Sequence, residues 1–173
     1  MTTPLPEVEQ LLEALTNQIR GNIKPDTGII GIHTGGVWVA ERLHSALRST
    51  VPLGTIDIAF YRDDYARRGL QGNVKPSDIP FDVSDRDVIL VDDVLYTGRT
   101  IRAAMNELFD YGRPGKVMLA ALVDRGGRQL PIEPQFVGSR LSVAEDQLVM
   151  LAREDSGSLR LSLTDRSSEN AQP

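Results

Sequence analysis

The chain has 173 residues, which is enough for one hydrophobic core and too few for two ordinary domains. Hydrophobic residues make up 40% and charged residues 25% of the sequence, the proportions of a soluble globular protein. The net charge of −5 argues against a broad nucleic-acid-binding surface, and the absence of cysteine excludes disulfides and cysteine-ligated metals. No apolar run approaches about 18 residues and no signal-peptide pattern is present, so we expect no membrane span and a cytoplasmic location.

The first half of the chain alternates between helical and strand periodicity. Apolar residues at helical spacing, with acids early and Arg20 late, indicate an amphipathic first helix. Residues 61–83 form a long polar connection, and such a length is typical of a lid or a binding loop. The elements that we expect before this connection are a helix over 4–20, a buried strand over 28–32, a turn over 33–36, a helix over 37–47 and an alternating strand over 53–61.

The stretch from Val88 to Thr100 reads V-I-L-V-D-D-V-L-Y-T-G-R-T. Its four leading apolar residues are too few for a helix and rich in β-branched side chains, which indicates a buried central strand over 88–91. Asp92 and Asp93 stand where that strand is expected to leave the sheet, before a turn at 97–100. The apolar residues after the turn recur at helical spacing and predict a helix face packed on the core, formed by Ile101, Met105, Leu108 and Phe109.

The last third of the chain continues with short strands. Because the residues from Thr164 onward are polar, we expect one domain over 1–163 and a disordered tail over 164–173. The elements expected here are an apolar strand over 117–123, a D-R-G-G-R segment at 124–128, short strands at 135–138 and 148–151, and an edge strand that carries Leu159, Leu161 and Leu163.

Strands that alternate with helices predict a parallel-sheet α/β domain, and such sheets bind ligands at the carboxyl ends of their strands. Four segments with polar or small residues follow predicted strands in this sequence. We therefore expect one site, built from His33–Gly36, Tyr61–Asp64, Asp92–Thr100 and Asp124–Arg128.

The composition of 92–100 indicates what this site binds. Backbone N–H groups at a helix start lack internal partners, so a turn of threonine and glycine there can cradle a phosphate. The adjacent carboxylates Asp92 and Asp93 need partners of their own, which sugar hydroxyls or a divalent cation would supply. Arg99 either adds charge or points to solvent. The alternative is an ordinary strand–helix unit with a threonine-rich cap and surface acids.

The full thirteen-residue run is more specific than its parts. It resembles the phosphoribosyl-pyrophosphate (PRPP) motif of the type I phosphoribosyltransferases. Its last ten residues, V-D-D-V-L-Y-T-G-R-T, are similar to the form found in the PyrR family of pyrimidine regulatory proteins and uracil phosphoribosyltransferases. The resemblance covers residues 11–151 and implies the type I phosphoribosyltransferase fold, a mainly parallel twisted sheet flanked by helices, with a flexible hood loop.

The resemblance also assigns a role to each segment. It implies that Asp92 and Asp93 hold the ribose hydroxyls and act in catalysis, that residues 61–83 form the hood, and that Arg62 is a catalytic cation. The pyrophosphate loop, which in the family often contains a cis peptide bond, corresponds to Thr34, Gly35 and Gly36, and the base-binding segment to Val123, Asp124 and Arg125. The binding site for the ribose and its 5-phosphate corresponds to Asp92, Asp93, Val94, Leu95, Tyr96, Thr97, Gly98, Arg99 and Thr100.

The activity that the resemblance implies is the synthesis of UMP and pyrophosphate from uracil and PRPP. Mg²⁺ would enter with PRPP near Asp92 and Asp93, without a site made by protein ligands alone. The hood cations available to contact pyrophosphate are Arg62, Arg67, Arg68 and Lys75, and the sequence does not distinguish among them. The family also implies a homodimer or a higher homo-oligomer, and regulation of pyrimidine genes in response to UMP, UTP or PRPP.

Tyr96 bears on the choice of base. In the purine-salvage relatives, the residue before the Thr-Gly pair is usually an acid that faces the purine ring, whereas tyrosine stands at this position here. This difference favours a pyrimidine. The alternative is that Tyr96 is only a packed aromatic residue.

Two features depart from the family pattern. Gly35 stands where the PyrR family commonly has arginine in the pyrophosphate loop, and loss of a charged donor to phosphate forfeits about 1.5–3 kcal/mol. We therefore expect weak PRPP binding and weak activity. The predicted first helix carries Glu7, Glu9 and Glu13 with only Arg20 as a cation, so RNA binding is disfavoured.

Other classes of protein fit less well. A nucleotide-sensing regulator with a vestigial PRPP site is the main alternative, and Gly35 is its best support. A receiver domain would need a lysine after a late strand, but Lys116 precedes its predicted strand. The glycine-rich motifs of P-loop nucleotide hydrolases and dinucleotide-binding domains are absent.

Overall fold

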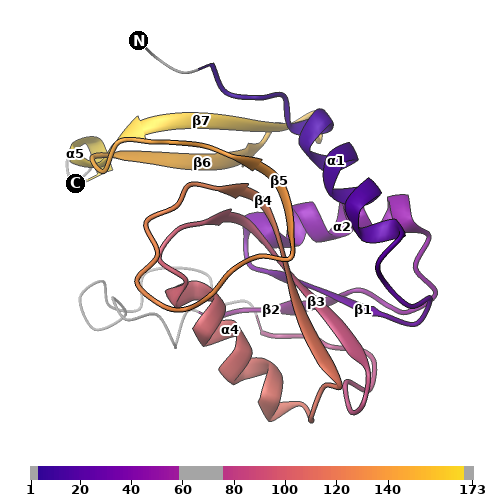
Figure 1. Cartoon of the computed structure of the whole chain (residues 1–173). Coiled ribbons are helices and arrows are strands. Elements are labelled where there is room, and N and C mark those ends of the chain that lie inside the picture. Colours follow the sequence, from indigo (N-terminus) through magenta and orange to yellow (C-terminus); the bar gives the residue numbers. More distant parts are fainter. Residues whose placement is uncertain (1–3, 59–75, 170–173) are drawn as a thin grey trace.

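Figure 1 shows the computed structural model of the chain, which describes residues 4–58 and 76–169. A parallel sheet of five strands lies at its centre, in the order β2-β1-β3-β4-β5. The predicted parallel α/β fold is therefore confirmed. The strands of this sheet are β1 (Gly28–Ile32), β2 (Gly54–Ile56), β3 (Asp87–Leu95), β4 (Lys116–Asp124) and β5 (Phe136–Arg140).

Helices cover both faces of the sheet. α1 (Val8–Arg20) and α2 (Gly35–Leu47) pack on one face, and α4 (Arg99–Asp110) packs on the other (Figure 1). Side chains of a strand alternate between faces, so Ile89 and Val91 of β3 join the first cluster while Val88 and Leu90 join the second. Burial on both faces is why the central strands are continuous apolar runs.

A second, antiparallel sheet follows the parallel one. It consists of β6 (Gln147–Arg153) and β7 (Leu159–Asp165), and its buried residues join the core beneath α1. The short helix α5 (Arg166–Glu169) comes directly after β7. The predicted boundary at residue 163 is therefore wrong, because strand and helix continue to Glu169, and residues 170–173 lie outside the described part of the chain.

Two other sequence predictions need correction. β2 ends at Ile56, short of the predicted residue 61, and the predicted strand beyond Ile58 lies outside the described residues. On its outer edge, Thr55 exchanges backbone hydrogen bonds with Asp78 (2.7 and 2.9 Å). Phe109 is 51% exposed instead of packed on the core. The buried face of α4 is formed by Ile101, Ala103, Ala104 and Leu108.

The start of α2 lies directly on the central strands. A Cβ added to Gly31 of β1 would come within 2.6 Å of the Val37 Cα atom and 2.9 Å of the Ala40 Cβ atom. A Cβ added to Gly36 would come within 2.5 Å of the carbonyl oxygen of Val91 in β3. Glycine on both sides of this contact lets the first turn of α2 approach the carboxyl ends of β1 and β3. Across the described residues, no helix combines the length and hydrophobicity that a bilayer crossing requires.

We predict that Gly31→Ala lowers the free energy of unfolding by about 2 kcal/mol, because overpacking a tight core costs about 1–3 kcal/mol. Gly21→Ala is the matched control, since Gly21 has a φ of −89° and no atom within 4 Å of the added Cβ. It should change stability by less than about 0.5 kcal/mol. Urea denaturation measures both, and equal stability of the two variants would contradict the packing described for α2.

Candidate functional site

The acid pair lies within β3 and not beyond its end. Asp92 stands opposite Ala121 of β4, and pairing with β4 continues through Val94 to Leu95, so the predicted strand end at Val91 is wrong. Asp92 is 6% exposed and Asp93 is half-buried. The following backbone amides hold both carboxylates: Asp93 N donates to Asp92 Oδ1 (3.0 Å), and Val94 N donates to Asp93 Oδ1 (2.8 Å).

Val94 and Leu95, predicted as part of the ribose and phosphate site, are largely packing residues. Leu95 is 1% exposed and joins the core on the α4 side. The Val94 side chain packs against the core on the opposite face. Any contribution that these two residues make to ligand binding would therefore come from their backbone.

The turn from Thr97 to Thr100 connects β3 to α4, and α4 already begins at Arg99. Gly98 has a φ of +91°, a conformation that favours glycine, and no side chain caps the helix at this position. The Arg99 backbone N–H donates to Thr97 Oγ1 (3.2 Å), while its exposed side chain donates through Nε to Gln129 Oε1 (3.0 Å). A helix start without a side-chain cap suits an anion such as phosphate.

The predicted pyrophosphate loop leads from β1 into α2. The peptide bond between His33 and Thr34 is cis, as the family resemblance implied for this loop. Gly35 and Gly36 are buried and already belong to α2, and the N-cap residue Thr34 makes no side-chain cap. The start of α2 therefore provides a second helix N-terminus beside the acid pair.

Gly35 lies against the carboxylate of Asp93. A Cβ added to Gly35 would stand 2.6 Å from Asp93 Cγ and 3.1 Å from Asp93 Cβ, and closer still to Asp93 Oδ2. Any side chain at position 35 would therefore push the Asp93 carboxylate out of its present position. Position 35 therefore differs from the family pattern in two ways. It lacks the charge of an arginine, and its lack of a side chain leaves room for the Asp93 carboxylate.

Tyr96 is enclosed by charged side chains. The Cζ atom of Arg125 lies 4.1 Å from the centre of the Tyr96 ring, and that of Arg166 lies 5.3 Å from it. A Cβ on Gly127 would come within 2.9 Å of Tyr96 Cδ2 and closer still to Cε2, so one edge of the ring lies close to this part of the backbone. These contacts favour the packed-aromatic alternative for Tyr96.

Arg125, which directly follows β4 of the parallel sheet, forms hydrogen bonds with the segment that leads into β6 of the antiparallel sheet. Its guanidinium donates to the carbonyl oxygens of Gln147 (2.7 Å) and Ala144 (3.1 Å), and the residue is 8% exposed. Burial lowers the pKa of the Arg125 guanidinium and Arg166 acts in the same direction, whereas Tyr96 acts against them. Arg125 belongs to the segment predicted to bind the base, and both Nη atoms of its side chain are engaged within the protein, whereas its buried Nε atom has no hydrogen-bond partner among the described residues.

Asp124 is the centre of a buried ion network. Its Oδ2 atom accepts hydrogen bonds from Arg128 Nη2 (2.7 Å) and Arg140 Nη1 (2.6 Å), and its Oδ1 atom accepts one from Gly126 N (3.0 Å). Burial by itself would raise the pKa of the Asp124 carboxyl, but the hydrogen bonds and the two nearby guanidinium groups hold the pKa below its usual value. A base could therefore use the backbone of 123–125 more readily than the Asp124 side chain, which is fully engaged.

The sequence did not single out several residues that shape the site. Arg128 donates to the carbonyl oxygens of Tyr96 (2.9 Å) and Ile132 (2.8 Å) as well as to Asp124, and so ties three segments together. Arg140, Arg166 and Gln129 come from β5, α5 and a loop. Only Arg128 stood in a segment predicted to be functional.

Some predicted site residues lie outside the described part of the chain. They are Tyr61–Asp64 with Arg62, and the other hood cations Arg67, Arg68 and Lys75. Their roles stay predictions.

The carboxylates fit Mg²⁺ only in part. Hard oxygen ligands suit this ion, and Asp92 and Asp93 are neighbouring carboxylates in the last part of β3 that pairs with β4, before the strand ends at Leu95. Within residues 4–58 and 76–169, however, no group of three or more acidic or histidine side chains is placed to hold a metal. A bound Mg²⁺ would therefore take most of its oxygens from a ligand and from water.

Comparison with known proteins agrees with this geometry. The phosphoribosyl transferase domain family matches residues 3–147. The protein named "Bifunctional protein PyrR" from Nitrosococcus oceani is 60% identical over 129 residues, 73% of either chain. That from Pseudomonas paraeruginosa is 50% identical over 152 residues, 85% of this chain and 89% of the relative. The chain belongs to the PyrR family.

Solved structures confirm the type I phosphoribosyltransferase fold of this PyrR-family chain. A hypoxanthine-guanine phosphoribosyltransferase from Bacillus anthracis aligns with a TM-score of 0.65 at 20% identity, covering 82% of this chain and 85% of that one. A purine phosphoribosyltransferase from Pyrococcus horikoshii aligns with a TM-score of 0.61 at 30% identity, covering 78% and 82%. This PyrR-family chain is therefore a phosphoribosyltransferase-fold protein.

We predict that Asp124→Asn lowers the free energy of unfolding by about 3 kcal/mol at pH 7, because breaking a buried ion pair leaves a buried charge without its partner. The folded-state pKa of Asp124 is lowered, so its contribution is complete above the unfolded pKa of about 3.9 and disappears as the pH falls through the folded value. The stability difference should stay constant from about pH 7 to 5 and shrink below about pH 4.

Urea denaturation at several pH values measures this effect, with Glu145→Gln as the control for loss of an exposed carboxylate. A difference that grew on acidification would contradict the sign derived from the ion network.

Proposed function

We propose that this chain is a uracil phosphoribosyltransferase that forms UMP and pyrophosphate from uracil and PRPP with Mg²⁺. The observation that carries the proposal is the position of the Asp92–Asp93 pair near the starts of α2 and α4, where the N-cap residues Thr34 and Gly98 make no side-chain cap. A substrate with a phosphate at one end, a sugar diol in the middle and a pyrophosphate at the other matches this order of groups.

In the reaction, the N1 atom of uracil forms a bond to C1 of the ribose while the bond from C1 to pyrophosphate breaks, and N1 loses its proton. The transition state carries positive charge on the sugar, which the carboxylates of Asp92 and Asp93 stabilise while they hold its hydroxyls. The α4 turn holds the 5-phosphate and the α2 start receives the pyrophosphate. Mg²⁺, when bound with PRPP, supplies positive charge that neutralises the departing pyrophosphate.

The preference for uracil rests on the segment around Tyr96. The side chain of Asp124 is engaged by Arg128 and Arg140, and that of Arg125 by the carbonyl oxygens of Gln147 and Ala144. The base would therefore meet the backbone of 123–125. Backbone N–H and C=O groups can pair with the imide edge of uracil. The fixed ring of Tyr96 would limit the space for a larger purine.

A second candidate is a regulator of pyrimidine genes that senses UMP, UTP or PRPP without turnover. Gly35 supports it, since the pyrophosphate loop offers no cationic side chain at that position. RNA binding by such a regulator is disfavoured along α1, where Glu9 is paired with Arg42 (2.6 Å) and Glu7 and Glu13 add negative charge.

An assay of UMP formation from uracil, PRPP and Mg²⁺ tests the enzyme directly. We expect wild-type turnover, and a decrease in kcat of about 100-fold in Asp93→Asn, because transition-state charge loses one stabilising group. Asp155→Asn, which removes an exposed carboxylate from the turn between β6 and β7, at the end of that hairpin opposite Gln147, should retain the wild-type kcat.

Calorimetric titration with UMP separates the two candidates. UMP binding without measurable turnover would favour the non-catalytic regulator, and absence of both UMP binding and turnover would contradict both.

Substitutions at Gly35 test the pyrophosphate loop. Gly35→Ala should weaken PRPP binding, because its Cβ displaces the Asp93 carboxylate. Gly35→Arg causes the same displacement but adds a charged donor, so it should bind PRPP about tenfold more tightly than Gly35→Ala. Comparison of these two variants isolates the charge, and equal PRPP affinities would show that the missing arginine does not limit binding.

A further inference from the structure

The loop between β4 and β5 supports the turn that begins α4. The backbone N–H groups of Gln129 and Leu130 both donate to the carbonyl oxygen of Thr97 (2.9 and 3.3 Å). A Cβ added to Gly98 would come within 3.3 Å of Ile132 Cβ and 3.5 Å of Leu130 Cβ, so the turn lies directly against the loop. Figure 1 shows the same loop passing beside the start of α4.

Arg128 connects this loop to both ends of the site. Its Nη1 atom donates to the carbonyl oxygen of Tyr96 (2.9 Å), directly before the phosphate turn, and its Nη2 atom donates to Asp124 Oδ2 (2.7 Å), in the predicted base segment. Its Nε atom donates to the carbonyl oxygen of Ile132 (2.8 Å) and closes the loop on itself. Because all three nitrogens belong to one rigid plane, these bonds fix the relative positions of their three acceptors.

The bonds of Arg128 begin where the regular pairing of the sheet ends. Backbone pairing of β3 with β4 stops at Leu95 and Asp124, and one more backbone bond follows, from Arg125 N to the carbonyl oxygen of Leu95 (3.0 Å). Beyond this point the two chains diverge toward α4 and the loop, and the Arg128 guanidinium spans from one to the other.

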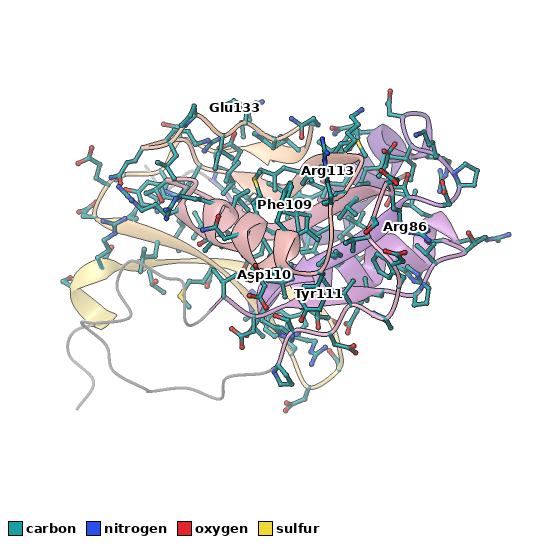
Figure 2. All side chains as sticks on the ribbon, turned by 90° about the horizontal axis from the view of Figure 1, so that it is seen from below. Arg86, Phe109, Asp110, Tyr111, Arg113 and Glu133 are labelled. Atoms are coloured by element: carbon teal, nitrogen blue, oxygen red, sulfur yellow. The ribbon has the colours of Figure 1, made fainter. Side chains whose placement is uncertain are left out.

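The buried contacts of Arg128 matter more than its exposed one. The Arg128 side chain is 15% exposed and that of Asp124 is 3% exposed, so water competes little for their hydrogen bond. The outer end of the loop reaches the surface, where Glu133 lies at the edge of the molecule in Figure 2. Its carboxylate is 3.7 Å from Arg128 Nε, but a pair with a largely exposed partner contributes little.

We propose that Arg128 is a positioning residue that fixes the separation between the base-binding backbone and the 5-phosphate turn. This inference rests on the proposed function, which assigns the base to residues 123–125 and the phosphate to residues 97–100. A ligand held at both ends gains from a fixed spacing, because its second end binds without any rearrangement of the protein. A ligand held at one end has no such gain. Arg128 therefore favours a complete nucleoside monophosphate over a sugar phosphate.

Calorimetric titration with UMP and with ribose 5-phosphate tests the inference without any need for turnover. Ribose 5-phosphate carries the diol and the phosphate but no base, so the ratio of its Kd to the Kd of UMP measures the contribution of the base end. Arg128→Gln should lower this ratio about tenfold through weaker UMP binding, because the two ends lose their fixed spacing. Arg128→Lys should lower the ratio as well, although it keeps a positive charge beside Asp124, because one ammonium group cannot reproduce three bonds from a plane.

Arg140→Gln is the matched comparison. It removes the other guanidinium from Asp124 Oδ2 but leaves the bond from Arg128 to the Tyr96 backbone in place, so the ratio should stay close to that of the wild type. Circular dichroism confirms that the variants are folded.

The two ligands also distinguish failure of this inference from failure of the proposed function. An unchanged ratio in Arg128→Gln, or an equal loss of affinity for both ligands, would overturn the positioning role and leave the proposed function standing. A wild-type chain that binds UMP no more tightly than ribose 5-phosphate would overturn the inference together with the base assignment. The expected ratios in a chain without turnover would support the inference and contradict the proposed reaction.

Discussion

The contact between the start of α2 and the ends of β1 and β3 is the constraint on which the site depends. Gly31 and Gly36 allow the backbone of the helix to lie directly on the strands, and Gly35 then meets the carboxylate of Asp93. In an ordinary strand–helix unit, packed side chains keep the helix backbone farther from the strand backbone than it lies here. Here the partial positive charge of a helix start is brought next to an acid on the central strand, so anion-binding and sugar-binding groups share one small space.

A second layer of support comes from arginines that bind carbonyl oxygens. Arg128 connects Asp124, the Tyr96 backbone and Ile132, and Arg125 connects the same edge to β6. Guanidinium groups can make several directed hydrogen bonds from one rigid plane, which suits the junction of irregular segments. The loops around the strand ends therefore have fixed partners even though they lack regular secondary structure.

The sequence predicted the parallel sheet well because β1 and β4 are uninterrupted apolar runs, a pattern that buried parallel strands require. It placed the end of β3 too early, since two acids normally end a buried strand, whereas backbone pairing with β4 carries the chain to Leu95. Phe109 matched the helical spacing but faces outward, because residues 103, 104 and 108 already fill the buried face. Arg140 and Arg166 could not be predicted as partners of Asp124 and Tyr96, since they reach them through tertiary contacts that no local spacing encodes. Arg128 lies only four residues after Asp124, so the D-R-G-G-R segment did contain one of its partners.

The position of Arg166 links the two sheets around one aromatic ring. The parallel sheet is made of residues up to Arg140, and Tyr96 directly follows its central strand β3. One of the two guanidinium groups on the Tyr96 ring comes from a residue after the last strand of the antiparallel sheet. The antiparallel sheet therefore supplies part of the surroundings of Tyr96, and a substitution that displaces the end of β7 would reach the edge of the parallel sheet through this contact.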